Sequence, residues 1–367
     1  MSRVARTSIP VQSPGRWSAW TALLFVLRLG GLMPFSAWFA LCLLVGAWYA
    51  FEIHIARPPM FWMGEPKPLD GMNPFTWTRT LRNQGFMLGY SDLKGNPLWA
   101  TYALTPPPQE AESLPPHEGF QADWRGLSRV VPDDFNRSGY ECGHLVPRHS
   151  IGLVYGESGQ RDAALMTNAT PQKSGLHAKL WERLEDLELD PFAKQFGKIW
   201  VMSGPIFDPP QERLHTSRRV DVPSAFFKII VAPEEKKMLA LVIPQTVRGD
   251  EPLEHYLTSV DAIEKRTGFD FFPDLADADE DRLEAAVDPE PWHLHELARR
   301  RTARKAVERP AGDTIVETNK FPVRPEVSKG KRERKESADH ASMPQHERLN
   351  STALPPGVAP KQRGASP

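Results

Sequence analysis

The sequence predicts an α+β domain in the middle of the chain. Short apolar stretches with many β-branched and aromatic residues, separated by Pro and Gly, are typical of β-strands. One segment instead has leucines at helical spacing and predicts a helix over residues 176–189. Because strands and helices do not strictly alternate, the order favours α+β over a doubly wound sheet. The predicted strands cover residues 98–104, 199–202, 226–231 and 238–243.

The N-terminal part of the chain predicts a membrane anchor. Residues 1–31 combine several arginines with a first apolar run, and residues 32–53 read LMPFSAWFALCLLVGAWYAFEI, with Glu52 as the only charge. About 20 apolar residues span a bilayer, and the upstream arginines favour a cytoplasmic N-terminus. The alternative is a cleaved signal peptide. The length of the run and the bulky Trp48, Tyr49 and Phe51 at its end favour an uncleaved anchor.

The remaining segments differ in composition. Residues 54–84 are Pro-rich and predict a linker, and residues 85–278 hold the domain, with a second helix over 257–266. Residues 279–309 predict a charged helical extension. Residues 310–367 lack an apolar period and predict a disordered tail. From Arg299 onward there are 16 Lys and Arg against 8 Asp and Glu, although the net charge of the chain is -1. A basic tail indicates either contact with a polyanion or membrane surface, or a solubilising role.

A segment of the domain contains the residue types of a hydrolytic site. His144 follows a glycine, and the predicted helix then carries His177, Trp181 and Glu185 at four-residue spacing, which predicts one shared helix face. Together these residues could supply a general base, a metal ligand and a carboxylate. Hydrolysis of a phosphodiester needs a base to activate water and a cation to offset charge. Such a group by itself is more often structural than catalytic.

The motifs around His144 resemble those of the DNA/RNA non-specific endonucleases, the family that includes the endonuclease G type. The family signature Asp-Arg-Gly-His followed by Leu-x-Pro stands here as ECGHLVP at residues 141–147. Many short motifs in the same order make a more specific signal than one motif alone. The flanking matches are GYS (89–91), PLW (97–99), YAL (102–104), MTN (166–168), PQ (171–172), SGPIF (203–207), VP (222–223), FFK (226–228), LVIPQ (241–245) and IEKRTGFDFFP (263–273).

The resemblance implies a mixed sheet and a ββα-metal finger, in which a hairpin carries the base and a helix carries the metal ligand. It implies that His144 deprotonates the attacking water, that Asn168 supports the site, and that Glu185 holds water near the metal. It further implies a divalent ion, Mg²⁺ or Mn²⁺, and DNA and RNA as substrates with little sequence preference, since contacts to the phosphate backbone carry little sequence information. Members of the family often form homodimers.

Two positions depart from the family pattern. His177 stands where the family has its metal-binding asparagine, which predicts activity with Mn²⁺ or a softer ion because imidazole is a softer ligand than an amide oxygen. Cys142 stands where the family has an arginine that contacts phosphate. Arg125, Arg148 and Lys173 are candidates to replace that arginine.

Two further readings of the function stay open. The first is a catalytically weakened nuclease fold that binds nucleic acid or a partner, and the second is a phosphodiesterase for small esters. If the anchor is present, it places the domain across a membrane. The short N-terminus lacks transit-peptide features, which favours the periplasmic side of a bacterial inner membrane over the mitochondrial intermembrane space. Cys42 lies in the apolar run and Cys142 beside the site, so no disulfide is expected between them.

Overall fold

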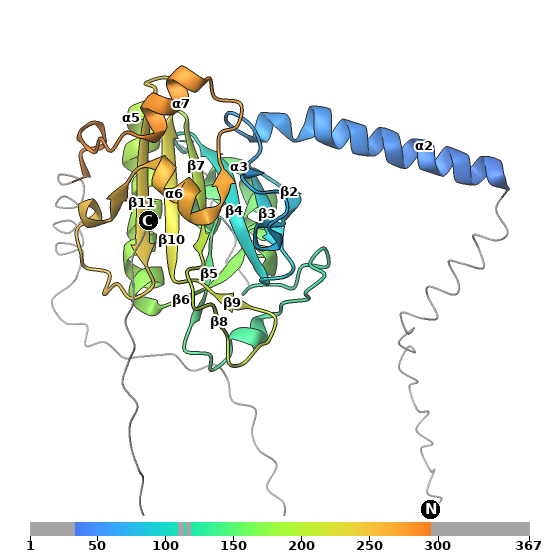
Figure 1. Cartoon of the computed structure of the whole chain (residues 1–367), viewed down its shortest axis with the longest axis horizontal. Coiled ribbons are helices and arrows are strands. Elements are labelled where there is room, and N and C mark those ends of the chain that lie inside the picture. The colour runs from blue at the N-terminus through green and yellow to red at the C-terminus, as the bar shows by residue number, and fades with distance from the viewer. Residues whose placement is uncertain (1–33, 109–113, 115–118, 295–367) are drawn as a thin grey trace, which may run out of the picture. The chain divides into compact units, whose positions relative to one another are not determined.

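The structure is a computed structural model that describes residues 34–108, 114 and 119–294. Its centre is a seven-stranded sheet with the order β12-β11-β10-β7-β4-β3-β2 (Figure 1). The strands are β2 (Arg79–Asn83), β3 (Phe86–Ser91), β4 (Asn96–Leu104), β7 (Ile199–Ile206), β10 (Ala225–Ala232), β11 (Lys237–Pro244) and β12 (Leu257–Thr258). All four predicted strands are confirmed, as β4, β7, β10 and β11.

The pairing of the strands corrects one expectation. Every neighbouring pair in the seven-stranded sheet is antiparallel, so the expected mixed sheet is wrong. The reason lies in the connections. Short turns join β2 to β3, β3 to β4 and β10 to β11, and a short turn can join only antiparallel neighbours. The long excursion between β4 and β7 also returns in the antiparallel direction.

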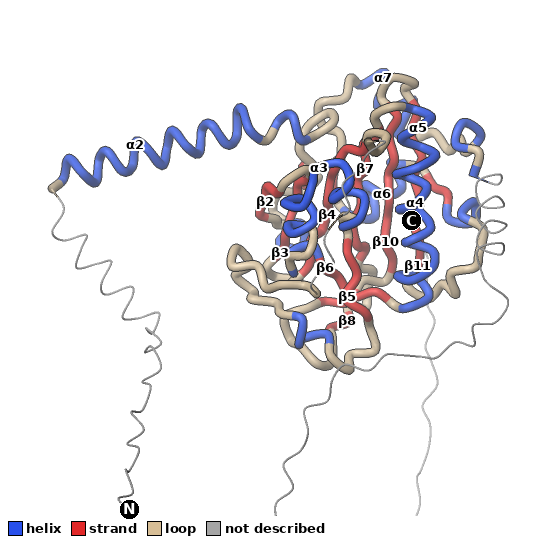
Figure 2. The backbone as a smooth tube through the Cα atoms, turned by 180° about the vertical axis from the view of Figure 1, so that it is seen from behind, coloured by secondary structure: helices blue, strands red, loops and turns tan. Residues whose placement is uncertain are grey.

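The sheet is the middle of three layers. Strand β10 shows this most clearly, because Phe226 and Ile230 pack into one hydrophobic cluster while Phe227 and Ile229 pack into another on the opposite face. One face is covered by the helical segment that runs from Leu176 to Phe196 and by α3 (Figure 2). The other face is covered by α6 and α7 (Figure 1).

The helices and the short elements that complete the fold are as follows. The helical segments are α3 (Arg148–Asp162), η6 (Leu176–Trp181), α4 (Glu182–Leu187), η7 (Glu188–Phe192), α5 (Ala193–Phe196), α6 (Val260–Thr267) and α7 (Asp277–Glu284), with short turns η2 (Pro58–Met60), η3 (Pro74–Thr76), η4 (Pro132–Phe135), η5 (Met166–Asn168), η8 (Leu253–Tyr256) and η9 (Glu290–Trp292). The short strand pairs are β1 (Lys67–Pro68) with β13 (Phe269–Asp270), β5 (Glu141–His144) with β6 (Ala169–Gln172), and β8 (Glu212–Arg213) with β9 (Asp221–Val222). The predicted helix over 257–266 begins later, because residues 257–258 form β12.

The predicted linker over residues 54–84 is instead part of the domain. Strand β2 is an edge strand of the large sheet, β1 pairs with β13 near the end of the domain, and Phe61 packs against Trp99. Prolines in this segment begin short 3₁₀ turns, which pack on the domain rather than separating it from the anchor. The domain therefore begins well before residue 85.

Within its described residues, 279–294, the predicted helical extension contains most of helix α7 and the turn η9. Trp292 in η9 is buried against Phe192 and Phe196. The rest of the helical extension predicted over 279–309 and the tail predicted over 310–367 lie beyond residue 294, outside the described residues. The segment 1–31 lies outside them as well.

The apolar run forms one long helix. Helix α2 (Phe35–Phe51) continues as the π-helical turn η1 (Glu52–Ala56), and residues 35–56 have the length and hydropathy needed to cross a membrane. Only 6% of the most apolar part of this helix is buried by the rest of the protein. It therefore does not pack as a core helix, although a signal sequence near an N-terminus has the same properties.

Candidate active site

A short hairpin followed by a helix forms the centre of the candidate site. Strand β5 pairs with β6 so that His144 lies opposite Ala169, and the helical segment η6–α4 begins shortly after β6. This is the ββα arrangement that the sequence motifs implied, with α3 inserted between the two strands. Gly143 leaves room for the buried side chain of Gln172 on β6, since a Cβ atom at position 143 would lie 2.1 Å from Oε1 of Gln172 and would force that side chain to move.

Asn168 fixes the loop that follows His144. Its Oδ1 accepts a hydrogen bond from the backbone N–H of Val146, and its Nδ2 donates to the carbonyls of Val146 and Ala163. The side chain is completely buried and does not line the cavity. Asn168 is thus a positioning residue that holds the backbone two residues beyond His144.

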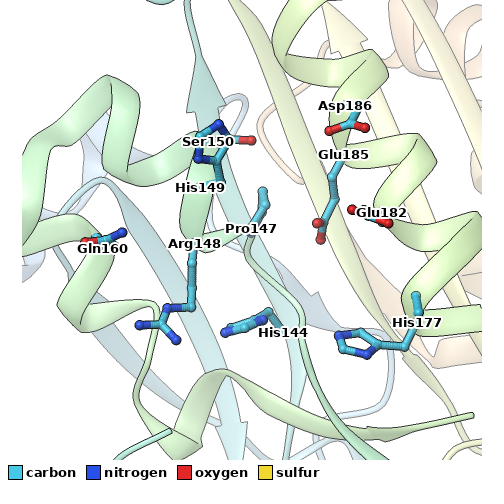
Figure 3. A pocket seen from close by; sticks show the side chains of 11 residues that line it. His144, Pro147, Arg148, His149, Ser150, Gln160, His177, Glu182, Glu185 and Asp186 are labelled. Atoms are coloured by element: carbon cyan, nitrogen blue, oxygen red, sulfur yellow. The ribbon is translucent and has the colours of Figure 1, made fainter. Parts of the chain in front are cut away.

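The cavity beside this loop brings the predicted residues together. It has a volume of about 520 Å³ and is lined by residues from the end of β5, the first turn of α3 and the helical segment η6–α4 (Figure 3). His144, His177 and Glu185 all line it, so these three predicted site residues share one cavity. Its complete lining is His144, Pro147, Arg148, His149, Ser150, Gln160, His177, Ala178, Glu182, Glu185 and Asp186.

The helix that carries His177 corrects the prediction for Trp181. Residues 176–181 form a π-helical segment, whose wider turns place residues five apart on one face. His177 and Glu182 therefore both line the cavity, whereas Trp181 turns into the core and packs edge-on against Phe226. The predicted shared face of residues 177, 181 and 185 is wrong at position 181.

His177 is held by an acidic residue of the hairpin. Its Nδ1 lies 2.6 Å from Oε2 of Glu141, which is on the same strand as His144. Burial raises the pKa of the Glu141 carboxyl, but hydrogen bonds from His177 and Ser174 outweigh that effect and leave the pKa lowered. An ionised carboxylate can only accept, so Nδ1 carries the hydrogen, and in the neutral ring Nε2 keeps its lone pair.

Glu185 lies near a buried network formed by Lys228, Glu188 and Tyr102. Burial, with added repulsion from Glu188, raises the pKa of Glu185 to about 8 although Lys228 opposes the shift. Behind it, the fully buried Lys228 donates to Glu188 at 2.5 Å, and Tyr102 donates to the other oxygen of Glu188 at 2.7 Å. The ammonium of Lys228 also lies 4.2 Å from the ring centre of Trp181. This network connects the helix bearing Glu185 to β4 and β10.

The three candidate phosphate contacts lie in different places. Arg148 lines the cavity from the start of α3. Arg125 does not line it, because its guanidinium is bound to Asp123 and to Asn83 and Arg82 beside the edge strand β2. Lys173 is also absent from the lining, and its ammonium lies 5.9 Å from the ring centre of Tyr140. Of the three candidates, Arg148 alone is among the residues that line this cavity, and the phosphate contacts predicted for Arg125 and Lys173 stay predictions.

Cys142 is a packed thiol. Its Sγ lies 4.0 Å from Sδ of Met166, and burial raises the pKa of the thiol to about 12. Both Cys42 and Cys142 are free cysteines. A thiol with such a pKa has almost no thiolate at neutral pH and is a poor nucleophile or metal ligand.

Other residues of the site were not found from the sequence. Phe120 stacks on the His144 ring, with ring centres 4.3 Å apart, and no local pattern connects two residues so distant in the chain. Glu182 and Asp186 form an acidic wall beside Glu185 (Figure 3). A prediction that assumed 3.6 residues per turn could not place Glu182 beside His177, because the local helix is π-helical.

The cavity contains one side chain, His177, that could serve as a metal ligand, and water would have to complete the coordination of an ion held there. Within the described part of the chain, His, Cys, Asp and Glu side chains converge in a group of three only elsewhere, on α6 and α7. At the cavity His177 is the ligand best prepared for a metal, since a ligating histidine usually donates its other ring N–H to a carboxylate. Glu182 and Asp186 add carboxylates on the same side, and Glu185, whose pKa is raised to about 8, would be ionised there by a bound cation.

Comparisons with known proteins identify relatives of this domain. The family model for DNA/RNA non-specific endonucleases matches residues 70–278. The chain is 25% identical to a nuclease from Nostoc, over 57% of this chain and 78% of that protein. It is also 25% identical to the mitochondrial nuclease EXOG of Xenopus laevis, over 62% and 68%. It is 28% identical to a nuclease from Serratia marcescens, over 48% and 63%.

Among solved structures, a chain of the EndoG/EndoGI complex aligns with 21% identity and a TM-score of 0.43, over 54% of this chain and 86% of that chain. The family model covers more than half of the sequence and spans β2 to β13 and the start of α7, including the ββα hairpin and the cavity. The chain belongs to the DNA/RNA non-specific endonuclease family, whose members are hydrolases acting on phosphodiester bonds and generally depend on a divalent metal.

Proposed function

We propose that this protein hydrolyses phosphodiester bonds in DNA and RNA, with little sequence preference, in a reaction that depends on a divalent metal. The observation that carries the proposal is the contact of His177 with Glu141, at 2.6 Å, beside a cavity that His144 also lines. It supports a metal ligand and a base on neighbouring elements of one site. The family to which the chain belongs adds independent support.

In this proposal His144 takes a proton from the attacking water. Histidine suits this role because its ordinary pKa of about 6.5 leaves it largely neutral at physiological pH. Phe120 packs on one face of the ring, and Asn168 holds the loop that follows, so the direction of the imidazole is restricted. A base that the protein already holds in the correct orientation reacts faster than a mobile one, because less of the activation barrier is spent on aligning it with the water.

The two walls of the cavity have opposite charge, which suits a metal and a phosphate side by side. Glu182, Glu185 and Asp186 lie on the wall that carries His177 (Figure 3). His177 would hold the ion with this acidic wall around it, and a divalent ion supplies charge stabilisation for the phosphate and the leaving oxygen. The opposite wall is the first turn of α3, where Arg148 and the backbone N–H groups of a helix start favour an anion.

Arg148 is accordingly the residue that would contact phosphate in place of the family arginine at position 142. It comes from the helix rather than the hairpin, but it lines the same cavity. Because His177 offers a nitrogen rather than an oxygen, we propose that Mn²⁺ or a softer ion supports activity at least as well as Mg²⁺.

We further propose that residues 35–56 anchor the enzyme in a membrane, at the periplasmic face of a bacterial inner membrane. The support is a helix of sufficient length that is apolar on all sides and is left uncovered by protein. A compartment outside the cytoplasm would keep a nonspecific nuclease away from the chromosome. Formation of a homodimer is a separate proposal, and its support is that members of the family often form homodimers.

The test compares the full-length protein with its His144→Ala variant on plasmid DNA and on RNA, with Mn²⁺, Mg²⁺ or a chelator. His215→Ala is the matched control, because His215 is exposed and does not line the cavity. We expect metal-dependent degradation of both polymers, loss of at least about 100-fold in His144→Ala, and no loss in the control. Full activity in His144→Ala would contradict the assignment of the base.

The main alternative is a nuclease fold that binds nucleic acid without cutting it. The departure at Cys142 favours it, since removal of a preorganised cation costs transition-state stabilisation. Tight binding of DNA or RNA without turnover, in the same experiment, would support this alternative. Turnover of small phosphodiesters with both polymers intact would instead indicate a phosphodiesterase.

A further inference from the structure

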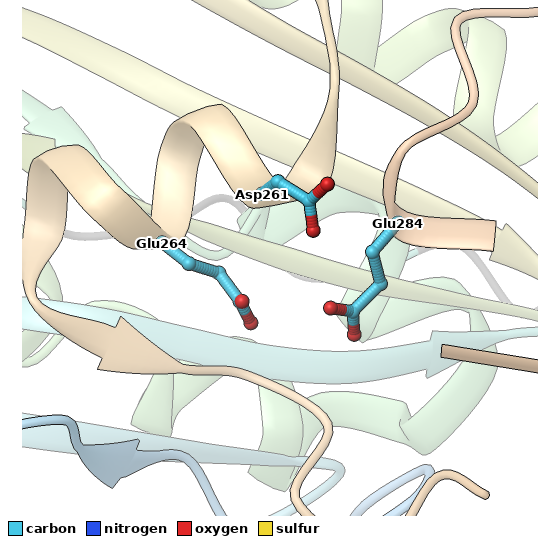
Figure 4. Close-up of side chains that lie close together, drawn as sticks. All are labelled: Asp261, Glu264 and Glu284. Atoms are coloured by element: carbon cyan, nitrogen blue, oxygen red, sulfur yellow. The ribbon is translucent and has the colours of Figure 1, made fainter. Parts of the chain in front are cut away.

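A second group of carboxylates lies away from the candidate active site. Asp261 and Glu264 are on α6, and Glu284 is the last residue of α7 (Figure 4). One oxygen from each carboxylate can be chosen so that all three lie within 4.8 Å of one another. Helices α6 and α7 cover the face of the sheet opposite to the helical segment that lines the cavity. This group is therefore separate from the site of phosphodiester hydrolysis.

Glu284 distinguishes this group from an ordinary exposed acidic patch. It is 2% exposed, and its buried Oε1 has no hydrogen-bond partner. Its carboxylate points toward Glu264 and Asp261 (Figure 4). A buried carboxylate oxygen without a partner is costly unless a cation or a proton compensates it.

The neighbouring basic side chains do not provide that compensation in the described part of the chain. Lys236 and Arg282 both pair with Asp279. Glu264 uses its Oε1 to accept the backbone N–H of Phe271 at 2.7 Å. One hydrogen bond to a neutral N–H group leaves most of the charge of three carboxylates unbalanced.

The burial and mutual repulsion of these carboxylates raise the pKa values of two of them. Burial, reinforced by the other carboxylates, raises the pKa of Glu284 to about 8 and the pKa of Glu264 to about 7. In the absence of a cation, then, one or two protons would have to remain within the group near neutral pH. A bound cation would remove that requirement.

We propose that Asp261, Glu264 and Glu284 hold a calcium ion that fastens α7 to α6. Oxygen ligands select a hard cation, and calcium accepts irregular sets of six to eight oxygens at 2.3–2.6 Å, so two of its ligands can be up to about 5 Å apart. Magnesium requires a smaller and nearly octahedral set. The remaining ligands would be water, since Asp261 is exposed.

The ion would stabilise the end of α7 and the described segment that follows it. Leu283, next to Glu284, is buried in the core, and the chain continues to Trp292, which closes over Phe192 and Phe196. Loss of the ion would thus loosen the end of α7 and the segment that follows, without altering the catalytic cavity. The expected signature is on stability rather than on the chemical step.

The test measures the melting temperature of the full-length protein in millimolar calcium chloride and in EDTA. All proteins carry His177→Ala, so that ions bound at the candidate active site do not contribute. The variant is Glu284→Gln, and Asp281→Asn is the matched control, because Asp281 is an exposed acid of the same helix outside the group. We expect calcium to raise the melting temperature by about 5 °C in the background and the control, at concentrations about 100-fold above Kd, and by none in Glu284→Gln.

The two conditions separate a metal ligand from a merely structural residue. In EDTA, Glu284→Gln should be at least as stable as the background, because glutamine is neutral without holding a proton on a buried carboxylate. Should that variant fail to fold, Asp261→Asn, at an exposed position, should lose the calcium shift. The proposal is overturned if calcium does not shift the background, or if Glu284→Gln keeps the shift. It is also overturned if the melting temperature depends on pH but not on calcium, since protons then compensate the group.

Discussion

Substitution of Glu141 by Gln should weaken metal binding while leaving the chemical step intact. Glu141 does not line the cavity, but its carboxylate accepts the Nδ1 hydrogen of His177 and so fixes the ring with Nε2 available for an ion. Glutamine has almost the same shape and can still accept a hydrogen bond, but it carries no charge. The change therefore removes the electrostatic part of the contact.

The magnitude follows from the exposure of the pair. Loss of a carboxylate behind a histidine ligand typically reduces metal affinity 10–100-fold, or about 1.4–2.7 kcal/mol. The side chain of Glu141 is 43% exposed and that of His177 is 30% exposed, so water screens the charge. We therefore expect the lower end of the range, about tenfold weaker binding of Mn²⁺.

The assay is calorimetric titration of Mn²⁺ together with cleavage rates at increasing Mn²⁺. The Mn²⁺ concentration for half-maximal rate should rise about tenfold, and kcat at saturating metal should stay near that of the unchanged protein. Glu157→Gln is the control, because Glu157 is also in an ion pair, with Arg161, but is exposed and outside the cavity. Unchanged Mn²⁺ affinity, or loss of kcat at saturating metal, would refute the reasoning.

Two further predictions concern buried charge near the cavity. Because the pKa of Glu185 is raised to about 8 in the metal-free protein, the stability contributed by its neutral form is lost as pH rises through that value. Thermal melts in EDTA should fall less between about pH 5 and 8 in Glu185→Gln than in the unchanged protein, while cleavage is lost; parallel pH profiles would contradict this. Lys228→Met leaves the Glu188 carboxylate buried and uncompensated and should cost about 3–5 kcal/mol in urea unfolding, with most of it regained when Glu188→Leu is added. A loss under about 1 kcal/mol for the single change would show that the pair is not tightly coupled.

The strands were predictable because they are buried on both faces. Residues 226–231, for example, form a nearly continuous apolar run, since both sides of β10 face hydrophobic clusters. The Pro-rich segment before residue 85 was misjudged because composition alone does not show pairing. Strand β2 is short and partly polar, and its place at the sheet edge depends on β3.

The site was predictable as a set of residues but not as a set of contacts. The motif located His144, and helical spacing located His177 and Glu185, all of which line one cavity. Nothing in the local sequence reveals a π-helical turn, which moved Trp181 into the core. Contacts between residues distant in the chain, such as Arg125 with Asn83, depend on the completed fold and could not be read beforehand.

The junction between the long apolar helix and the domain determines how an anchored enzyme could work. Glu52, one residue past the end of α2, is buried and accepts hydrogen bonds from Arg57 and from Arg82 on β2. A flexible spacer would let a catalytic domain sweep through a wide volume above the lipid, whereas a clamped junction restricts it to a narrow range of orientations. An enzyme held in this way would act mainly on polymers that come to the bilayer surface. The arrival of DNA or RNA at that surface, rather than movement of the catalytic domain, would then limit its rate in the cell.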